Sequence, residues 1–327
     1  MSFLISRRRF IGNVGAIAAA SAGSFRFLSA AVAPPLYPPM DLSCFDKPIT
    51  PASSEIRFGY AAIAWKENDR QAINEISEAG YRGIQLRANA LTEFGDRPTL
   101  LRDLLQQHRL EMVALSSGNV NVEPGAEAGQ IALHTEHARF VRNVGGLYLQ
   151  LIDSARPRDR KPVAEDYKML GRLLSRIGRR AADIGVPIAY HNHMGSLGES
   201  PDDVDRVMNE VDPHYVRLLL DVAHYQQGGG DPAKAIRQYR DRILFLHVKD
   251  VESHAPAPGA NAGQSYRFVE LGRGRVDLHA VFDALKEIKF RGWGVVELDG
   301  ASDDARSPKE SAIISKKYLE EKLGMKV

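Results

Sequence analysis

The chain has 327 residues, of which 44% are hydrophobic and 26% are charged. This balance excludes a disordered, collagen-like or multi-span membrane protein, and the length suffices for one large α/β domain or two small ones. The net charge is +2, but the first 33 residues hold four arginines and no acidic residue, so the remainder carries a net charge of −2. We therefore expect no nucleic-acid-binding surface.

The N-terminus has the pattern of an export signal. Arg7, Arg8 and Arg9 precede a short apolar segment from Asn13 to Ala22 that is too short to span a membrane. The Arg-Arg-x-Phe-Ile order resembles a twin-arginine signal, which carries folded proteins out of the cytoplasm. We expect residues 1–33 to be a signal peptide and the protein to be periplasmic, without stable membrane insertion after export. An uncleaved amphipathic anchor is the alternative.

A Pro-rich arm over residues 34–55 separates this signal from the main domain. It contains Cys44, the single cysteine of the chain, so no intramolecular disulfide can form. We find no residues in this arm with a recognisable chemical role.

From Ile56 onward, short apolar segments alternate eight times with segments of helical periodicity. The predicted strands are Ile56–Trp65, Gly83–Arg87, Met112–Ser116, Tyr148–Ile152, Ile188–His193, Arg217–Asp221, Ile243–Val248 and Gly294–Leu298. One predicted helix places Met169, Leu170, Leu173, Leu174, Ile177 and Ala181 on its apolar face. Gly80, Gly185 and Gly292 are predicted to end helices just before the next strand.

Eight strand–helix units over residues 56–327 predict a (β/α)8 TIM barrel, which typically needs about 250 residues. An open, doubly wound sheet has the same local pattern and is the alternative. However, no Gly-x-Gly-x-x-Gly motif follows the first strand, and no phosphate-binding Gly-x-x-x-x-Gly-Lys is present. The Gly228–Gly230 run is followed by Asp231-Pro232, which is typical of a helix start. We therefore expect the barrel.

Polar residues gather at the ends of the last four strands. They are His191 and His193, Asp221 and His224, His247 and Lys249, and Glu297 and Asp299. The C-terminal strand ends of a barrel converge on one mouth, where active sites lie. Because buried charges without partners cost several kcal/mol each, a divalent cation is a plausible common partner. Mixed imidazole and carboxylate ligands suit Mn, Fe, Co or Zn better than Ca.

Each of these residues taken alone also has a structural explanation. A single histidine at a strand end can be a hydrogen-bonded structural residue. Asp221 could cap the next helical turn, and Lys249 with Asp250 could be an exposed ion pair. The joint occurrence of imidazoles, carboxylates and a lysine at the ends of apolar strands favours a metal site.

Five short motifs carry a resemblance to a known family. They are Tyr190-His191-Asn192-His193-Met194-Gly195, Leu220-Asp221-Val222-Ala223-His224, His247-Val248-Lys249-Asp250, Leu271-Gly272-Arg273-Gly274 and Val296-Glu297-Leu298-Asp299. In this order they resemble the sugar phosphate isomerase/epimerase superfamily, with its xylose isomerase-like barrel, over essentially all of residues 56–327. They look most like the inosose dehydratase branch and exported relatives that act on 3-keto-glycosides.

The resemblance implies a ligand set for one divalent metal. Epimerases of the family use Glu, Asp, His and Glu from the fifth to eighth strands, and the last three match Asp221, His247 and Glu297. His191 occupies the first carboxylate position, so it is the fourth expected ligand. A metal-bound imidazole is a poor base, which favours elimination over epimerisation. Gln85 is a second departure, because many relatives carry Glu there.

These expectations define a function. The metal, one of Mn, Co, Fe, Zn or Mg, would polarise a ketone so that the neighbouring proton becomes acidic. His193, Lys249 and Glu297 are the candidates for proton transfer, with His224 as acid for a departing oxygen. We expect a metal-dependent carbon–oxygen lyase acting on a keto-sugar or keto-inositol. A metal-dependent sugar isomerase or epimerase and a non-catalytic sugar-binding barrel are the alternatives.

Overall fold

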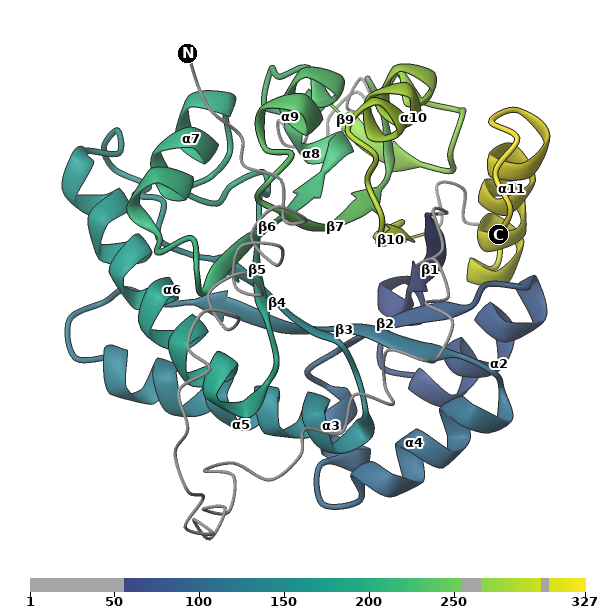
Figure 1. The fold of residues 1–327 in the computed structure, drawn as a ribbon, viewed down its shortest axis with the longest axis horizontal. Helices are drawn as coiled ribbons and strands as arrows, with labels where there is room; N and C mark the ends of the chain where they lie inside the picture. Colours follow the sequence, from purple (N-terminus) through teal and green to yellow (C-terminus); the bar gives the residue numbers. More distant parts are fainter. Residues whose placement is uncertain (1–55, 254–265, 301–305) are drawn as a thin grey trace, which may run out of the picture. The chain divides into compact units, whose positions relative to one another are not determined.

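The computed structural model describes residues 56–253, 266–300 and 306–327, so the predicted signal peptide and Pro-rich arm lie outside the described residues. Eight parallel strands close into a barrel with helices around it, which confirms the predicted fold (Figure 1). The barrel strands are β1 (Arg57–Ala61), β2 (Gly83–Arg87), β3 (Glu111–Val120), β4 (Tyr148–Asp153), β5 (Ile188–His191), β6 (Val216–Asp221), β7 (Ile243–Val248) and β10 (Trp293–Val296).

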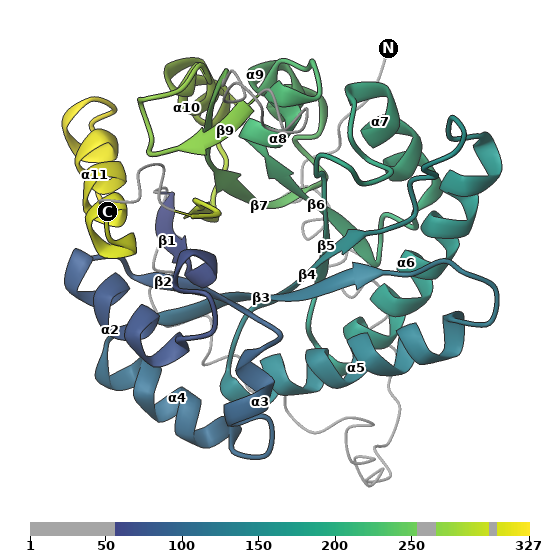
Figure 2. The same ribbon diagram turned by 180° about the vertical axis from the view of Figure 1, so that it is seen from behind.

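Helices follow the strands in sequence and cover the outside of the barrel, as the view from behind also shows (Figure 2). They are η2 (Ala62–Trp65, a 3-10 helix), α2 (Asp69–Ala79), α3 (Ala90–Phe94), α4 (Pro98–Gln107), α5 (Glu127–Val144), α6 (Ala164–Ile184), α7 (Pro201–Glu210), α8 (Val222–Gln227), α9 (Pro232–Gln238), α10 (Leu278–Glu287) and α11 (Pro308–Glu321). No helix in the described ranges is long and apolar enough to cross a membrane.

The strand order around the barrel is β1-β10-β7-β6-β5-β4-β3-β2, and β2 pairs with β1 to close it. The pairing register aligns the strands that carry the polar residues. His191 of β5 lies opposite Leu219 of β6, and Asp221 of β6 lies opposite His247 of β7. The backbone N–H of Glu297, just beyond β10, donates to the Val248 carbonyl at 3.2 Å. Backbone hydrogen bonding therefore holds the last four strand ends at one level.

Several helix boundaries follow the predicted signals. Gly80 and Gly185 end α2 and α6 in the left-handed conformation, and Asp231 caps α9 ahead of Pro232. The prediction for Gly292 is wrong: α10 ends at Glu287, and Lys289 adopts the positive φ of 54° at which the chain turns back. Since Lys289 supplies the left-handed residue, Gly292 lies in the approach to β10 instead.

The structure differs from the predicted strands in length. β1 ends at Ala61 because residues 62–65 form the 3-10 helix, and Lys66 ends that helix with a positive φ of 59°. β5 ends at His191 and β10 at Val296, so His193 and Glu297 lie just beyond their strands.

The apolar face predicted for the helix that is α6 is largely confirmed. Met169 is exposed, whereas the other five predicted core residues are buried.

A short antiparallel hairpin is present that the periodicity does not predict. It pairs β8 (Asp250–Ser253) with β9 (Tyr266–Val269), after β7 and outside the barrel. Each strand has only four residues, too few to show a clear alternation. The hairpin matters because it brings Phe268 over the residues at the end of β7.

The barrel interior is filled by a small apolar cluster that is distinct from the larger core beneath the helices. Its buried members are Ala61, Val113, Ala114, Ala189, Leu219, Phe245, Trp293 and Val295. Side chains along a strand alternate between the two faces, so a residue two positions further on also points inward. This cluster is therefore the floor on which the next layer of inward-facing residues stands.

Candidate metal and acid–base site

The predicted ligands form that next layer. His191, Asp221, His247 and Glu297 each lie two residues beyond a floor residue, namely Ala189, Leu219, Phe245 and Val295. All four are buried. Because the strands are parallel, the same step along each strand brings the four side chains to one height near the C-terminal mouth.

Three of these residues bring ligand atoms together. One ligand atom each from His191, Asp221 and His247 lies within 4.8 Å of the others. Asp221 Oδ2 is 3.4 Å from His191 Nε2 and 3.4 Å from His247 Nδ1. Glu297 Oε1 lies 3.4 Å from the same His247 Nδ1, so the fourth predicted residue borders the group.

Asp221 combines the structural role and the proposed ligand role that its sequence position suggested. Its Oδ1 accepts hydrogen bonds from the backbone N–H groups of Ala223 and His224, at 2.9 and 2.8 Å, and so caps α8. Asn192 donates to the Asp221 carbonyl and accepts from its N–H, which fixes the backbone. With Oδ1 occupied in this way, Oδ2 is the atom turned toward the two imidazoles.

His247 provides the test of whether a cation fits. Its Nε2 lies 3.0 Å from Gln85 Oε1, an atom that can only accept, so Nε2 carries a hydrogen. Its Nδ1 has no hydrogen-bond partner among the described residues and lies between two carboxylates. Burial favours the neutral ring, but Glu297 and Asp221 outweigh it and raise the pKa of His247 to about 9. The centre therefore attracts positive charge at Nδ1, and its nitrogen and carboxylate donors suit a divalent transition metal.

Lys249 adds a fixed positive charge beside this group. Its Nζ donates to Glu297 Oε1 at 3.0 Å and to Asp299 Oδ1 at 2.7 Å, and it lies 3.9 Å from the centre of the Phe268 ring. Burial opposes the charge, but Asp299 and Glu297 hold the pKa of Lys249 above its ordinary range. Lys249 is therefore an ammonium group, which suits it to stabilise or donate to a negative oxygen, and not to accept a proton.

His193 and His224 form a second pair next to the ligands. Their ring centres are 3.9 Å apart, and each lies within 6 Å of the His191 ring, at 5.5 and 5.7 Å. His193 Nδ1 donates to the Met194 carbonyl at 2.7 Å, so Nε2 is the atom left to take up a proton. The Met194 N–H donates to His224 Nδ1 at 3.2 Å, which puts the hydrogen of the neutral His224 ring on Nε2.

The predicted residues thus occupy one region, with distinct environments. Burial lowers the pKa of His191 to about 4 and the pKa of His224 well below its ordinary value, so both rings are neutral. The charges of His247 and Lys249 keep the pKa of Glu297 well below its usual range despite its burial. A carboxylate so stabilised is a weak base, which leaves His193 as the better candidate for proton abstraction.

The sequence analysis missed two neighbours of this region, Gln150 and Phe268, and named Asp299 without giving it a role. Gln150 lies on β4, two residues beyond Tyr148, and contacts His191. Asp299 pairs with Lys249, and Phe268 packs against Lys249 and His224. Gln150 had a usable signal, a polar residue at an inward position of the otherwise apolar strand Tyr148–Ile152. Phe268 had none, because its hairpin is not predicted.

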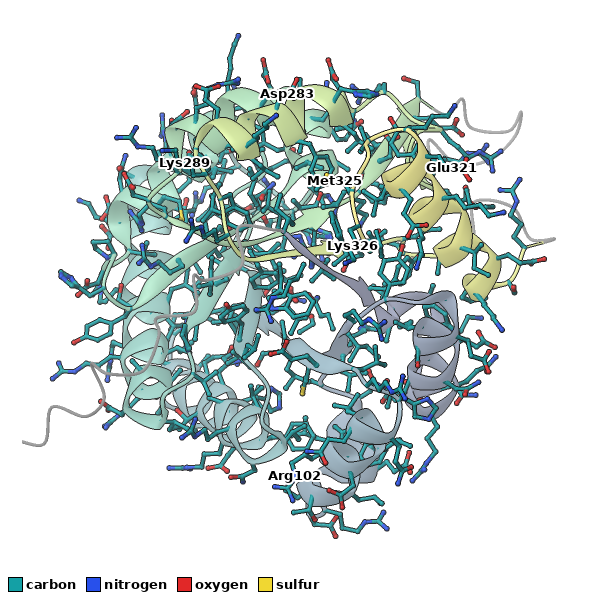
Figure 3. All side chains as sticks on the ribbon, turned by 45° about the vertical axis from the view of Figure 1, so that its right-hand side comes forward. Arg102, Asp283, Lys289, Glu321, Met325 and Lys326 are labelled. Carbon is teal, nitrogen blue, oxygen red and sulfur yellow. The ribbon has the colours of Figure 1, made fainter. Side chains whose placement is uncertain are left out.

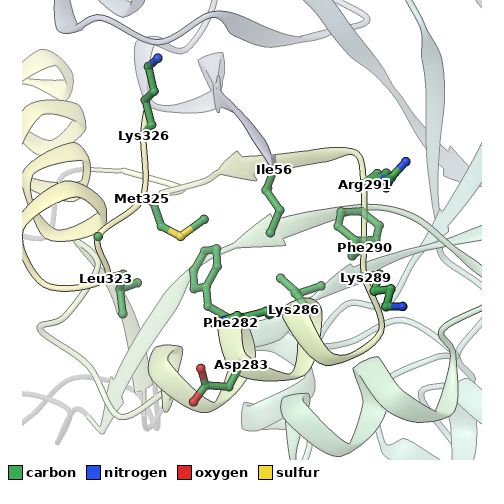
Figure 4. Close-up of a pocket in the computed structure, with 12 residues that line it drawn as sticks. Ile56, Phe282, Asp283, Lys286, Lys289, Phe290, Arg291, Leu323, Met325 and Lys326 are labelled. Carbon is green, nitrogen blue, oxygen red and sulfur yellow. The ribbon is translucent and has the colours of Figure 1, made fainter. Parts of the chain in front are cut away.

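A separate cavity of about 650 Å³ lies at the opposite end of the barrel strands (Figure 4). Ile56, just before β1, and Arg291, just before β10, line it together with α10 and the C-terminal segment. Figure 3 marks Lys289, Met325 and Lys326 in this region. Its lining lacks the imidazole and carboxylate cluster, so we place the chemistry at the mouth and not in this cavity.

Comparison with known proteins agrees with this fold. The family model described as Xylose isomerase-like TIM barrel matches residues 73–321. Inosose dehydratase from Lacticaseibacillus casei is 30% identical over 295 residues, an alignment that covers 81% of this chain and 96% of that protein. Inosose dehydratase from Clostridium beijerinckii is 26% identical and covers 83% of this chain and 99% of its own length.

Solved structures share the fold at lower identity. The IOLI protein with a binding zinc atom has a TM-score of 0.68 at 22% identity and covers 81% of this chain and 97% of its own. A D-tagatose 3-epimerase-like protein has a TM-score of 0.66 at 17% identity and covers 82% and 97%. Together with the family match over most of the barrel, these results show that the chain belongs to the Xylose isomerase-like TIM barrel family.

Proposed function

We propose that this protein is an exported, divalent-metal-dependent lyase that eliminates a β-substituent from a keto-inositol or keto-sugar. The observation that carries the proposal is the buried group of His191, Asp221, His247 and Glu297 at the barrel mouth, beside a lysine ammonium. The inosose dehydratase relatives support the choice of a dehydratase acting on a keto-inositol. A 3-keto-glycoside presents the same ketone and β-oxygen, and it is the second substrate class to test.

Different residues of the site would bind the metal, remove the proton and stabilise the developing negative charge. The ligand candidates are His191, Asp221, His247 and Glu297, and a bound divalent metal supplies Lewis-acid polarisation of the substrate ketone. His193 removes the neighbouring proton through Nε2, the nitrogen left free by its bond to Met194. The Lys249 ammonium stabilises negative charge that develops on the substrate oxygen.

Departure of the β-oxygen requires a donor on the neighbouring carbon. His224 Nε2 carries a hydrogen and has no hydrogen-bond partner in the part of the chain that the structure describes. This nitrogen is therefore the donor we assign to the departing oxygen. The His193 and His224 rings are tilted to each other with their centres 3.9 Å apart, so we place the base and the donor on one side of the site. Epimerisation needs proton donors and acceptors on both faces of one carbon, which this arrangement does not favour.

The test is product analysis with a keto-inositol and a 3-keto-glucoside, using Mn-loaded and metal-stripped protein in deuterated water. Loss of water or of the aglycone, seen only with metal, supports the lyase. A product that has lost no group and is heavier than the substrate only by the solvent deuterium it carries identifies an isomerase or epimerase. Metal-dependent binding without turnover identifies a binding protein.

Two histidine variants test whether His193 is the base that removes the proton. His193→Ala should reduce turnover by about 10²–10⁴-fold while the protein keeps its metal. The matched control is His214→Ala, which removes an exposed imidazole next to the opposite end of β6. Equal turnover in the two variants would show that His193 is not the base.

A further inference from the structure

Two buried glutamines connect the two imidazoles of the proposed metal centre. Gln85 on β2 and Gln150 on β4 are each 2% exposed, and we call them the amide relay. His247 Nε2 lies 3.0 Å from Gln85 Oε1, and Gln150 Nε2 lies 3.0 Å from His191 Nδ1. Between the glutamines, Gln85 Nε2 donates to Gln150 Oε1 at 3.5 Å. The chain of contacts runs across the barrel from one histidine to the other.

The amide relay has a direction, because each amide accepts at one end and donates at the other. His247 Nε2–H donates to Gln85, Gln85 donates to Gln150, and Gln150 donates to His191 Nδ1. A neutral His191 whose Nδ1 accepts must carry its hydrogen on Nε2. That Nε2–H faces Asp221 Oδ2 at 3.4 Å.

If both amides were turned around, His191 and His247 would exchange their hydrogen positions, but one ring would still accept from an amide and the other would still donate to one. His191 would then donate from Nδ1 and present a bare Nε2, while His247 would accept at Nε2 and carry its hydrogen on Nδ1. With both hydrogen bonds to the amides intact, only one neutral imidazole at a time presents a lone pair to the centre. The restriction therefore does not depend on which way the amides point.

We infer that the amide relay, in the orientation that the structure shows, makes His247 the imidazole ligand and holds His191 as an Nε2–H donor and not as a ligand. His247 binds through Nδ1, which lies 3.4 Å from both Asp221 Oδ2 and Glu297 Oε1. This inference rests on the proposed metal centre and refines it. Asp221, His247 and Glu297 then supply three protein ligands, a number typical of catalytic metal sites that keep a position open for substrate. His191 becomes a positioning residue that orients Asp221 Oδ2.

A single carboxylate in the amide relay removes the restriction, because a carboxylate accepts at both of its oxygens. In Gln85→Glu, one oxygen accepts from His247 Nε2–H and the other accepts from Gln150 Nε2. The Gln150 oxygen then turns to His191 and accepts from Nδ1–H. Both imidazoles can present bare nitrogens to the centre, and His191 becomes able to bind metal.

The first measurement is the histidine tautomer in the metal-free, full-length protein by ¹⁵N NMR, with the His191 signal assigned by its loss in His191→Gln. We expect the hydrogen on Nε2 in the native protein and on Nδ1 in Gln85→Glu. A native His191 with its hydrogen on Nδ1 overturns the inference. This readout needs no metal and no substrate.

The second measurement is Zn²⁺ affinity by calorimetry for His191→Ala, made in the native and in the Gln85→Glu backgrounds. We expect the loss of Zn²⁺ affinity caused by His191→Ala to be about 10-fold or more larger in the Gln85→Glu background, where His191 can bind metal, than in the native background, where it only orients Asp221. Gln85→Glu adds a negative charge that by itself changes the Zn²⁺ affinity. Both proteins compared in that background carry this charge, so its effect drops out of the ratio of their dissociation constants. A loss in the Gln85→Glu background that is no larger than the loss in the native background overturns the inference.

Failure of the proposed function gives a different result. If no variant binds a divalent cation, the metal centre itself is wrong. If Zn²⁺ binds normally but the tautomer or the affinity pattern is reversed, the metal centre stands and only the role of the amide relay is wrong.

Discussion

Asp250 should be one of the more costly carboxylates to remove, because it organises the loop that carries the Leu271–Gly274 motif. It is fully buried, and its two oxygens accept four backbone N–H groups. The donors are Val251 at 2.9 Å, Gly272 at 3.0 Å, Gly274 at 2.9 Å and Val276 at 3.0 Å. A Cβ at Gly274 would overlap with Asp250 Oδ1, so glycine is needed there for close approach.

The expected loss in Asp250→Ala can be worked from these four bonds. The N–H groups of Gly272 and Gly274 are partly buried, so water can replace the carboxylate for them. The N–H groups of Val251 and Val276 are buried and would be left unsatisfied, at about 1–3 kcal/mol each. We therefore expect the free energy of unfolding to fall by about 4 kcal/mol, and the melting temperature by about 10 °C.

Urea denaturation of the purified protein measures this loss, with Asp277→Ala as the matched control. Asp277 caps α10 through a single bond, to the N–H of Ala280 at 2.9 Å, and its removal should cost about 1 kcal/mol. If Asp250→Ala costs no more than Asp277→Ala, the four-bond argument is refuted. The β8–β9 hairpin begins at Asp250 and carries Phe268, so turnover should also fall in Asp250→Ala.

Three further predictions concern the metal, the ammonium group and export. His247→Ala and Glu297→Gln should each lose most of the bound metal in elemental analysis, and full stoichiometry in both would exclude the assigned ligands. Lys249→Met should keep its metal but lower the turnover number by about 10²-fold, and unchanged turnover would remove Lys249 from the mechanism. We propose export by the twin-arginine route, so replacing Arg7 and Arg8 by lysine should leave the precursor inside the cell, whereas normal export would exclude that route.

The barrel and the level of the site follow from local sequence rules. Strands such as Ile188–His191 and Ile243–Val248 are short apolar runs, and helix caps such as Gly80 and Asp231 mark where the intervening helices end or begin. Once parallel strands are assigned, the period of two places His247 above Phe245 without any knowledge of the structure. The strands, the helix caps and the alternation of side chains depend only on residues a few positions apart in the chain, so they can be predicted from the sequence.

The remaining features depend on contacts between distant segments. Gln150 becomes important only because β4 lies next to β5 and across from β2, which brings it to His191 and Gln85. The charge state of Lys249 depends on Glu297 and Asp299, which lie 48 and 50 residues away in the chain. For this reason the sequence indicated Lys249 as a possible base, whereas its surroundings keep it protonated.

The pH dependence of folding offers a test of the centre that requires no substrate. In the metal-free protein, the pKa of His247 rises from its ordinary 6.5 to about 9, because Glu297 and Asp221 outweigh the effect of burial. A raised pKa gives stability that is fully present below pH 6.5 and is lost as the pH rises to about 9. The shift corresponds to about 3 kcal/mol of unfolding free energy.

Metal binding should abolish this loss, because a cation bound at Nδ1 takes the place of the proton and its charge does not change with pH. Urea denaturation between pH 6.5 and 9, with and without a chelator, should therefore show a decline only in the metal-free protein. His247→Gln is the matched control, since it lacks the titrating ring and should remove the decline from the metal-free protein. A metal-free native protein whose stability stays flat across this interval would show that His247 is not held as a cation between Asp221 and Glu297. The same result would remove the electrostatic argument for a metal at this position.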